Sequence, residues 1–273
     1  AQPFQPHADR SGWLTAYSAE TLGQWQPAFG FWLSYARDPV VLFVDGEPTA
    51  RVVGDLLTAN VQAAIGFGPV DLALDLPIHL AVAGDGLATW GEGPQGAAAG
   101  DLRVVPKVKI LDPGIRPVGL ALVLPISLPT GDEEKFAGLR TVSVAPTLAV
   151  SQRVGQFHLG ANLGYRIAGA EDVGDLVAGN SFLFRLGVGY SPHSAVDVGA
   201  EIYGDVHSQP RNNPVEWLLC VTVHPTPGLG LTLGGGTALG HGFGAPEGRL
   251  VFGVGFVPQL AKDTDGDGYK DSK

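Results

Sequence analysis

The chain has 273 residues, of which 45% are hydrophobic and 16% charged, and its formal net charge is −10. This acidic balance argues against nucleic-acid binding, because phosphate recognition needs a basic surface. No run of about 18 uncharged apolar residues occurs, so membrane-spanning helices are not expected. The 40 glycines and 21 prolines also disfavour helices.

Residues 1–23 form a first region that differs from the rest. The chain opens on Ala1 and Gln2 with neither an initiator methionine nor a charged leader, which predicts a mature exported protein whose signal peptide has been removed. Aromatic residues such as Trp13 and Tyr17 occur here without a sustained period. We therefore predict an irregular N-terminal segment, periplasmic or luminal, rather than a strand.

From residue 24 to 258 apolar and polar residues alternate with a period of two, which is the pattern of β-strands. Short segments with turn residues, such as Gly68-Pro69, separate some of the strands, and longer glycine-rich or acidic loops separate the others. The alternation predicts about twelve strands, which cover Trp25–Tyr35, Leu57–Phe67, Val70–Leu80, Leu102–Ile110, Val118–Leu128, Val142–Val150, Phe157–Tyr165, Ser181–Tyr190, Val196–Tyr203, Val215–Val223, Leu229–Leu233 and Leu250–Phe256.

These strands indicate an all-β fold, a transmembrane antiparallel up-and-down β-barrel. One face of each strand is rich in Leu, Val and Phe, and the other carries Gly, Ala, Ser and isolated charges. Such a polar face would be a poor soluble surface but suits a narrow lumen, so a soluble β-sandwich is the weaker alternative. The single Cys220 cannot form an internal disulfide and is expected to be a packed small residue.

The connections predict the orientation of the barrel. Long loops, the first at Asp38–Ala50, alternate with short turns such as Pro225–Gly228. Outer-membrane barrels place long loops outside the cell and short turns in the periplasm. We therefore expect a bacterial outer-membrane protein, surrounded by lipid, with both termini in the periplasm.

Opposite charges on the inward faces predict ion pairs that close the lumen. If Tyr190 faces Val196 across its turn, Arg185 lies opposite Glu201. The remaining luminal charges are expected on neighbouring strands, with Asp71 and Asp75 on one and Arg103 and Lys107 on the other. Small inward residues leave space that water or another segment must fill. We expect Trp13 or Tyr17 in the barrel mouth, and a disordered leader is the alternative.

Residues 259–273 form an acidic tail whose spacing suits a calcium ion. Counted from Asp263, carboxylates recur at the first, third, fifth and ninth positions. A glycine stands at the sixth position, and a backbone carbonyl is available at the seventh. The expected calcium ligands are Asp263, Asp265, Asp267, Tyr269 (through its carbonyl) and Asp271. An EF-hand is less well matched, because no helix precedes the loop and no glutamate follows at position twelve. A solvated acidic end is the alternative.

The tail resembles the thrombospondin type-3 repeats that follow the barrel in OmpA-family proteins, and three further segments, Ser18–Gly23, Leu128–Asp132 and Ala161–Arg166, are similar to that group. This resemblance implies a structural or cell-surface interaction scaffold. Peptidoglycan would be bound only through further domains missing here. TraB-like members of the group partner a surface receptor in outer-membrane exchange between cells, which implies a receptor protein as a partner.

No catalytic constellation is predicted. A barrel phospholipase would need a serine beside a histidine on the outer wall, whereas His79, His158 and His224 are all predicted to point inward. Two function classes therefore remain: the interaction scaffold with a closed lumen, and a porin or small-solute channel with an open one.

Overall fold

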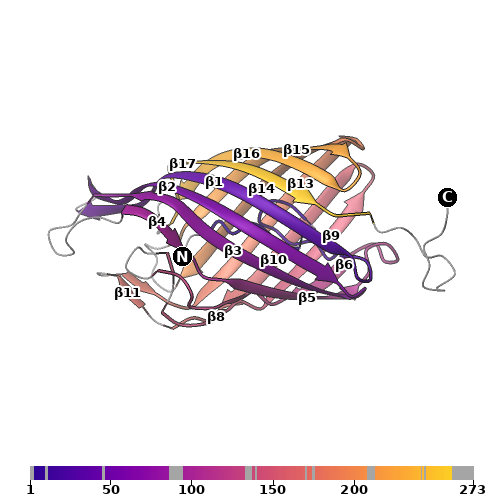
Figure 1. Cartoon of the computed structure of the whole chain (residues 1–273), viewed down its shortest axis with the longest axis horizontal. Coiled ribbons are helices and arrows are strands. Elements are labelled where there is room, and N and C mark those ends of the chain that lie inside the picture. Colours follow the sequence, from indigo (N-terminus) through magenta and orange to yellow (C-terminus); the bar gives the residue numbers. More distant parts are fainter. Residues whose placement is uncertain are drawn as a thin grey trace.

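The computed structural model describes residues 3–9, 12–44, 47–85, 95–132, 137–138, 140–169, 171–173, 176–207, 213–240, 242 and 244–259. Within these residues the chain folds into one closed antiparallel β-barrel of twelve wall strands, as the alternation predicts (Figure 1). The expected calcium ligands of the tail lie outside the described residues.

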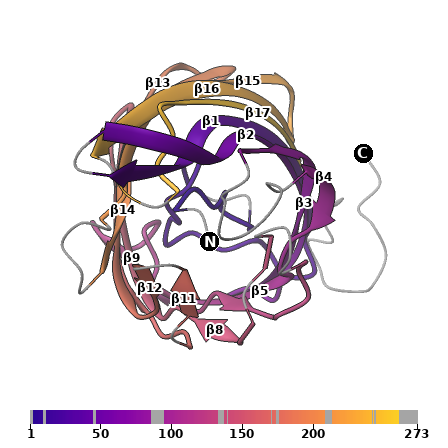
Figure 2. The same ribbon diagram turned by 90° about the vertical axis from the view of Figure 1, so that its left-hand side faces the viewer.

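Pairing between consecutive wall strands builds most of the barrel, and one long-range pairing joins its two ends. The first strand pairs with the last, from Phe29 opposite Phe256 to Arg37 opposite Gly248. The third wall strand also pairs with the fourth, so the ring seen end-on in Figure 2 is continuous. The wall consists of β1 (Pro27–Val44), β2 (Glu47–Gly66), β3 (Val70–Ala83), β5 (Arg103–Leu111), β6 (Gly119–Val123) with its continuation β7 (Ile126–Ser127), β9 (Thr147–Val154) preceded by β8 (Ser143–Val144), β10 (Phe157–Arg166), β13 (Ser181–His193), β14 (Val196–His207), β15 (Val215–Thr226), β16 (Leu229–Gly240) and β17 (Gly248–Phe256).

The two faces of each strand follow the predicted alternation. On β1, Phe29 and Phe31 point outward and are 50% and 40% exposed, whereas Trp32 and Ser34 point inward and are buried. The outer surface is therefore a continuous band of large apolar side chains, and the buried interior is polar or small. Within the described part of the chain, no helix has the length and apolar character needed to span a bilayer.

The prediction of a loop at Asp38–Ala50 is wrong. β1 continues as far as Val44, and β2 already begins at Glu47. Asp38 has a positive φ of 51°, and the register of the pair shifts between Arg37 and Val40. This irregularity interrupts the alternation of the sequence without ending the strand. The hairpin therefore extends the wall at the end that carries the longer loops.

Two of the predicted loops also contain short strands. β4 (Gln95–Ala99) lies within the loop after β3 and pairs with that strand. β11 (Glu171–Val173) and β12 (Leu176–Ala178) form a separate two-stranded hairpin between β10 and β13. These additions, like the β1–β2 extension, all lie at the long-loop end of the barrel (Figure 1).

Candidate functional site

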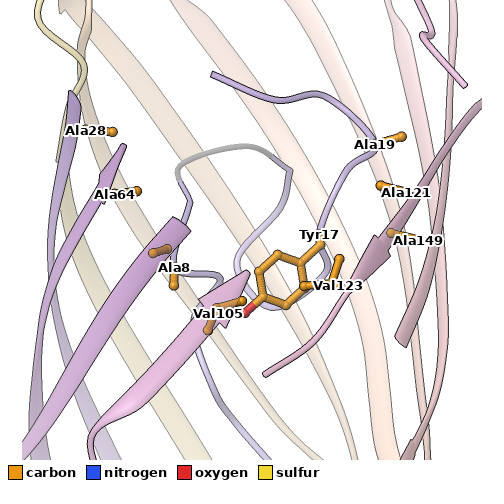
Figure 3. Packing of buried hydrophobic residues seen from close by; sticks show 10 residues of the cluster. Ala8, Tyr17, Ala19, Ala28, Ala64, Val105, Ala121, Val123 and Ala149 are labelled. Carbon is orange, nitrogen blue, oxygen red and sulfur yellow. The ribbon is translucent and has the colours of Figure 1, made fainter. Parts of the chain in front are cut away.

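The lumen holds the N-terminal part of the chain, which we call the luminal segment (residues 3–9 and 12–23). Figure 2 places this indigo segment inside the ring of strands. The wall makes room for it because many inward positions carry alanine, including Ala28, Ala73, Ala121 and Ala149, all fully buried. Ala8, Tyr17 and Ala19 of the segment pack against this alanine surface (Figure 3).

Trp13 lies in a niche made by glycines of three neighbouring strands. A Cβ atom added at Gly160 would overlap the Trp13 ring, and one added at Gly187 would lie 2.8 Å from it. Gly199 on the next strand is also in contact range, at 3.8 Å. These glycines are needed because any side chain would occupy the space of the indole.

Tyr17 is held by both its backbone and its ring. Asn162 of β10 accepts a hydrogen bond from the Tyr17 N–H at 2.7 Å and donates one to its carbonyl at 2.9 Å. The ring lies between Val105 and Val123 inside the barrel (Figure 3). Burial raises the pKa of the Tyr17 phenol to about 12, so this residue contributes a neutral hydroxyl.

Glu201 of β14 binds the luminal segment and not Arg185. Its carboxylate accepts hydrogen bonds from the backbone N–H groups of Leu14, Thr15 (2.9 Å) and Ala16 (3.2 Å), and from the Thr15 hydroxyl (2.7 Å). Three converging N–H groups stabilise a buried carboxylate in the way that a positive side chain would. Glu201 therefore anchors the turn at the middle of the segment.

The predicted pairing of Arg185 with Glu201 is wrong. The strands reach further toward the turn than the sequence pattern indicates, so that Tyr190 faces Val198 and His193 faces Val196, with an irregularity between the two pairs. In this register Arg185 lies opposite Tyr203, and Glu201 lies opposite Gly187. A two-residue difference in register thus separates the two charges.

The β3–β5 interface carries four of the predicted luminal charges. Asp71 lies opposite Lys107 and Asp75 opposite Arg103 in the pairing of these strands. The Lys107 ammonium is 3.3 Å from Asp71, and the Arg103 guanidinium is 2.6 Å from Asp75. All four side chains are almost fully buried.

The same four charges also bind the luminal segment. Lys107 donates to the Asp9 carboxylate and to the Glu20 carbonyl, and Asp71 accepts from the Leu22 N–H at 3.0 Å. Arg103 donates to the Gln5 amide oxygen at 2.9 Å and the Pro6 carbonyl at 3.0 Å. The charges therefore join two wall strands to the segment in one network.

A second buried network, missed in the sequence, lies on the opposite wall. Arg249 of β17 donates to Glu216 of β15 at 2.9 Å, and the Tyr203 hydroxyl donates to the same carboxylate at 2.9 Å. The Arg249 guanidinium also lies 4.5 Å from the centre of the Phe4 ring. The sequence does contain one indication of this network: Tyr203, Glu216 and Arg249 each lie between apolar or glycine neighbours on or directly beside a predicted strand.

Next to these networks is a cavity of about 140 Å³ at the long-loop end of the lumen, which we call the loop-end cavity. Its floor includes Phe4 and Gln5 of the luminal segment. One side is apolar, with Val53, Leu56 and Val82 packed together, and the other is polar. The polar residues include Ser34, Thr58, Asn60, Asp75, His79, Asp101, Arg103, Ser127, Ser143 and Arg166.

At the short-turn end, four polar side chains form a chain of contacts. His158 Nε2 lies 2.7 Å from the Ser191 hydroxyl, Ser191 donates to Asp197, and His224 Nε2 lies 2.7 Å from the other Asp197 oxygen. A serine nucleophile needs its carboxylate to orient the histidine that activates it. Asp197 instead contacts Ser191 directly, so these residues do not have that geometry. Among the described residues no cluster of potential metal ligands is found.

A family model described as "Putative MetA-pathway of phenol degradation" matches residues 61–241, more than half of the chain. The chain belongs to this family. The expected OmpA family gains no support from the comparisons, and neither do thrombospondin repeats. No curated protein matches the sequence of this phenol-degradation family member.

Solved structures with the same fold are outer-membrane proteins. An outer membrane channel from Pseudomonas putida F1 is 14% identical with a TM-score of 0.64, over 88% of this chain and 98% of that chain. The porin NanC is 10% identical with a TM-score of 0.55, over 85% of this chain and 100% of the porin. At these identities the likeness shows a shared barrel fold.

Proposed function

We propose that this protein is an outer-membrane channel for small solutes whose lumen is closed at rest by the luminal segment. The observation that carries the proposal is the combination of a barrel fold similar to a channel and a porin with a cavity that opens inside the barrel. The outer band of large apolar side chains supports a position in lipid. The channel is thus preferred over the scaffold.

The orientation in this proposal follows the lengths of the connections. The turn between β15 and β16 spans only residues 227–228, and that between β13 and β14 only residues 194–195, whereas the opposite end carries the extended β1–β2 hairpin and longer segments. Short turns are typical of the periplasmic side. The loop-end cavity would then face the outside of the cell and receive solutes first.

The way the luminal segment is held supports its role as a removable closure. Besides the apolar packing of Phe4, Leu14 and Tyr17, the wall holds the segment by hydrogen bonds and ion pairs from Arg103, Lys107, Asn162 and Glu201. Water can replace such contacts at modest net cost, unlike the contacts of a large apolar core. If the segment leaves, the lumen that remains is lined by small and polar residues that water can wet.

The solute class suggested by the family description is a small aromatic compound, and the apolar side of the loop-end cavity would suit such a ring. Val53, Leu56 and Val82 offer a compact apolar surface opposite polar groups that could fix the orientation of a ring substituent. Phenol is the simplest probe of this class.

Planar-bilayer conductance tests the proposal. Deleting residues 2–20 should raise the conductance from near zero to a stable open level, because the deletion removes Trp13, Tyr17 and the contacts of Glu201. A variant in which the same residues are replaced by glycine and serine separates loss of the specific contacts from loss of bulk. Heat-modifiable gel mobility checks that each barrel is folded. A deleted barrel that is folded yet does not conduct would refute the channel.

A scaffold remains the second candidate, because the polar networks that fill the lumen are what a closed structural barrel would also need. The predicted receptor partner belongs to this candidate. Co-purification of a surface protein with a folded, non-conducting barrel would favour it.

A further inference from the structure

Arg185 differs from the other buried cations of the lumen. Within the described residues, Arg103, Lys107, Arg166 and Arg249 each form an ion pair with a carboxylate at 3.3 Å or less. Arg185 is only 6% exposed, its Nε atom has no hydrogen-bond partner there, and no ion pair involves its side chain. The Nε atom of this guanidinium is therefore buried without a hydrogen-bond partner, and no described carboxylate forms an ion pair with the side chain.

A buried charge without a partner is costly, because it loses its hydration and gains no compensating interaction. Asp205 of the neighbouring strand β14 accepts a hydrogen bond from Arg166 at 2.8 Å through one oxygen, and its other oxygen has no hydrogen-bond partner among the described residues. Three guanidiniums, Arg103, Arg166 and Arg185, thus share two carboxylates, Asp75 and Asp205. One positive charge is left over at this point of the lumen.

A small cavity of about 20 Å³ lies against this excess charge. Its lining includes the three arginines and Tyr17, whose hydroxyl is also buried and without a hydrogen-bond partner in the described part of the chain. A space of this size holds about one water molecule, and a carboxylate oxygen needs no more. The free donors around it, from Arg185 and Tyr17, suit an acceptor with negative charge.

The small cavity adjoins the loop-end cavity. Both are lined by Gln5, Arg103, Ser127, Ser143 and Arg166, so a ligand could place its charged end in the first and its body in the second. The body would then face the apolar surface of Val53, Leu56 and Val82. The combined shape suits a compact apolar group that carries one acidic substituent.

We infer that Arg185 and Tyr17 form the anion-binding end of a site for small organic carboxylates, with the loop-end cavity holding the apolar body. The Arg185 guanidinium, with its fork of donors, and the Tyr17 hydroxyl would both donate to the one carboxylate oxygen that the small cavity holds. The inference rests on the proposed channel and specifies the charge of its solute.

Calorimetry on the whole purified protein in chloride-free buffer tests this site with three probes of similar shape: benzoate, phenol and benzylamine. Benzoate should bind roughly tenfold or more tightly than phenol, and benzylamine should not bind, because only the carboxylate pairs with Arg185. Arg185→Gln should weaken benzoate binding by roughly tenfold or more and leave phenol binding unchanged. Arg185→Lys keeps the charge but loses the fork, and an intermediate loss is expected.

The control is Arg116→Gln, which removes an exposed arginine in the β5–β6 turn and should change nothing. Heat-modifiable mobility again reports folding, and the lysine variant keeps the test usable if the glutamine variant misfolds. Equal affinity for benzoate and phenol, full benzoate affinity in Arg185→Gln, or binding of chloride alone would overturn the site. These binding measurements are independent of conductance. A protein that binds benzoate but never conducts would refute the channel and keep the site. A protein that conducts but binds benzoate and phenol equally well would keep the channel and refute the site.

Discussion

The glycines around Trp13 show how a single missing atom can determine what occupies the lumen. Gly160 and Gly187 leave no space for a side chain beneath the indole, whereas a Cβ at Gly189 would lie 3.4 Å from Trp13, an ordinary contact distance. Glycine is unfavourable in strands, since it loses more conformational entropy than other residues. Its use here is explained by the close approach of the tryptophan ring.

This difference gives a matched pair of variants. Gly160→Ala should push the Trp13 ring out of its niche, and an overpacking cost of roughly 1–3 kcal/mol would raise the population with a displaced segment about tenfold. Gly189→Ala adds the same methyl group on the same wall and should leave the closed state unchanged. Bilayer conductance of the two proteins compares them, and equal conductance would mean that Trp13 does not hold the segment in place.

At the scale of single residues, the sequence predicts which side chains are inside but not which ones meet. The inward positions of Asp71, Asp75, Arg103 and Lys107 follow from the period of two, and neighbouring strands bring them together. The partner of Glu201 could not be found in this way, because it is the backbone of residues 14–16 in a segment without a period. Long-range contacts of irregular segments leave no local pattern.

At the scale of elements, strand ends were the least predictable feature. The wall strands were predicted by alternation, but β1 and β2 continue beyond Asp38, where a bulge breaks the period, and Pro39 interrupts it further. The register of β13 on β14 was likewise missed because an irregularity near the turn changes the pairing of the whole hairpin. Such irregularities depend on tertiary packing, which no local pattern encodes.

The expected calcium ligands of the acidic tail lie outside the described residues, and calcium binding there stays a prediction. Titration calorimetry should detect saturable calcium binding that Asp265→Ala reduces several-fold, because the third-position carboxylate would be lost. Lys262→Ala, in the same tail, removes no expected ligand and should bind as the parent does. Unchanged binding by Asp265→Ala would indicate a solvated acidic end.

For the whole molecule, the predicted orientation can be tested by cysteine labelling on intact cells. In a Cys220→Ser background, Asp45→Cys, which lies between β1 and β2 in the sequence, should react with a membrane-impermeant maleimide. Pro227→Cys in the β15–β16 turn should react only after the outer membrane is opened, because this turn is expected in the periplasm. Labelling of Pro227→Cys on intact cells would reverse the topology and the outward position of the loop-end cavity.

The contacts of the luminal segment make it a tethered ligand of its own barrel. Because the segment is covalently attached, its local concentration at the lumen is on the order of millimolar or higher and does not change with the amount of protein in the membrane. A solute that contacts Tyr17 or Gln5 would bind best while the segment is in place, so by linkage it would favour the occupied lumen. Uptake by such a barrel would then need a second event that releases the segment, and cargo capture and passage would be separate steps.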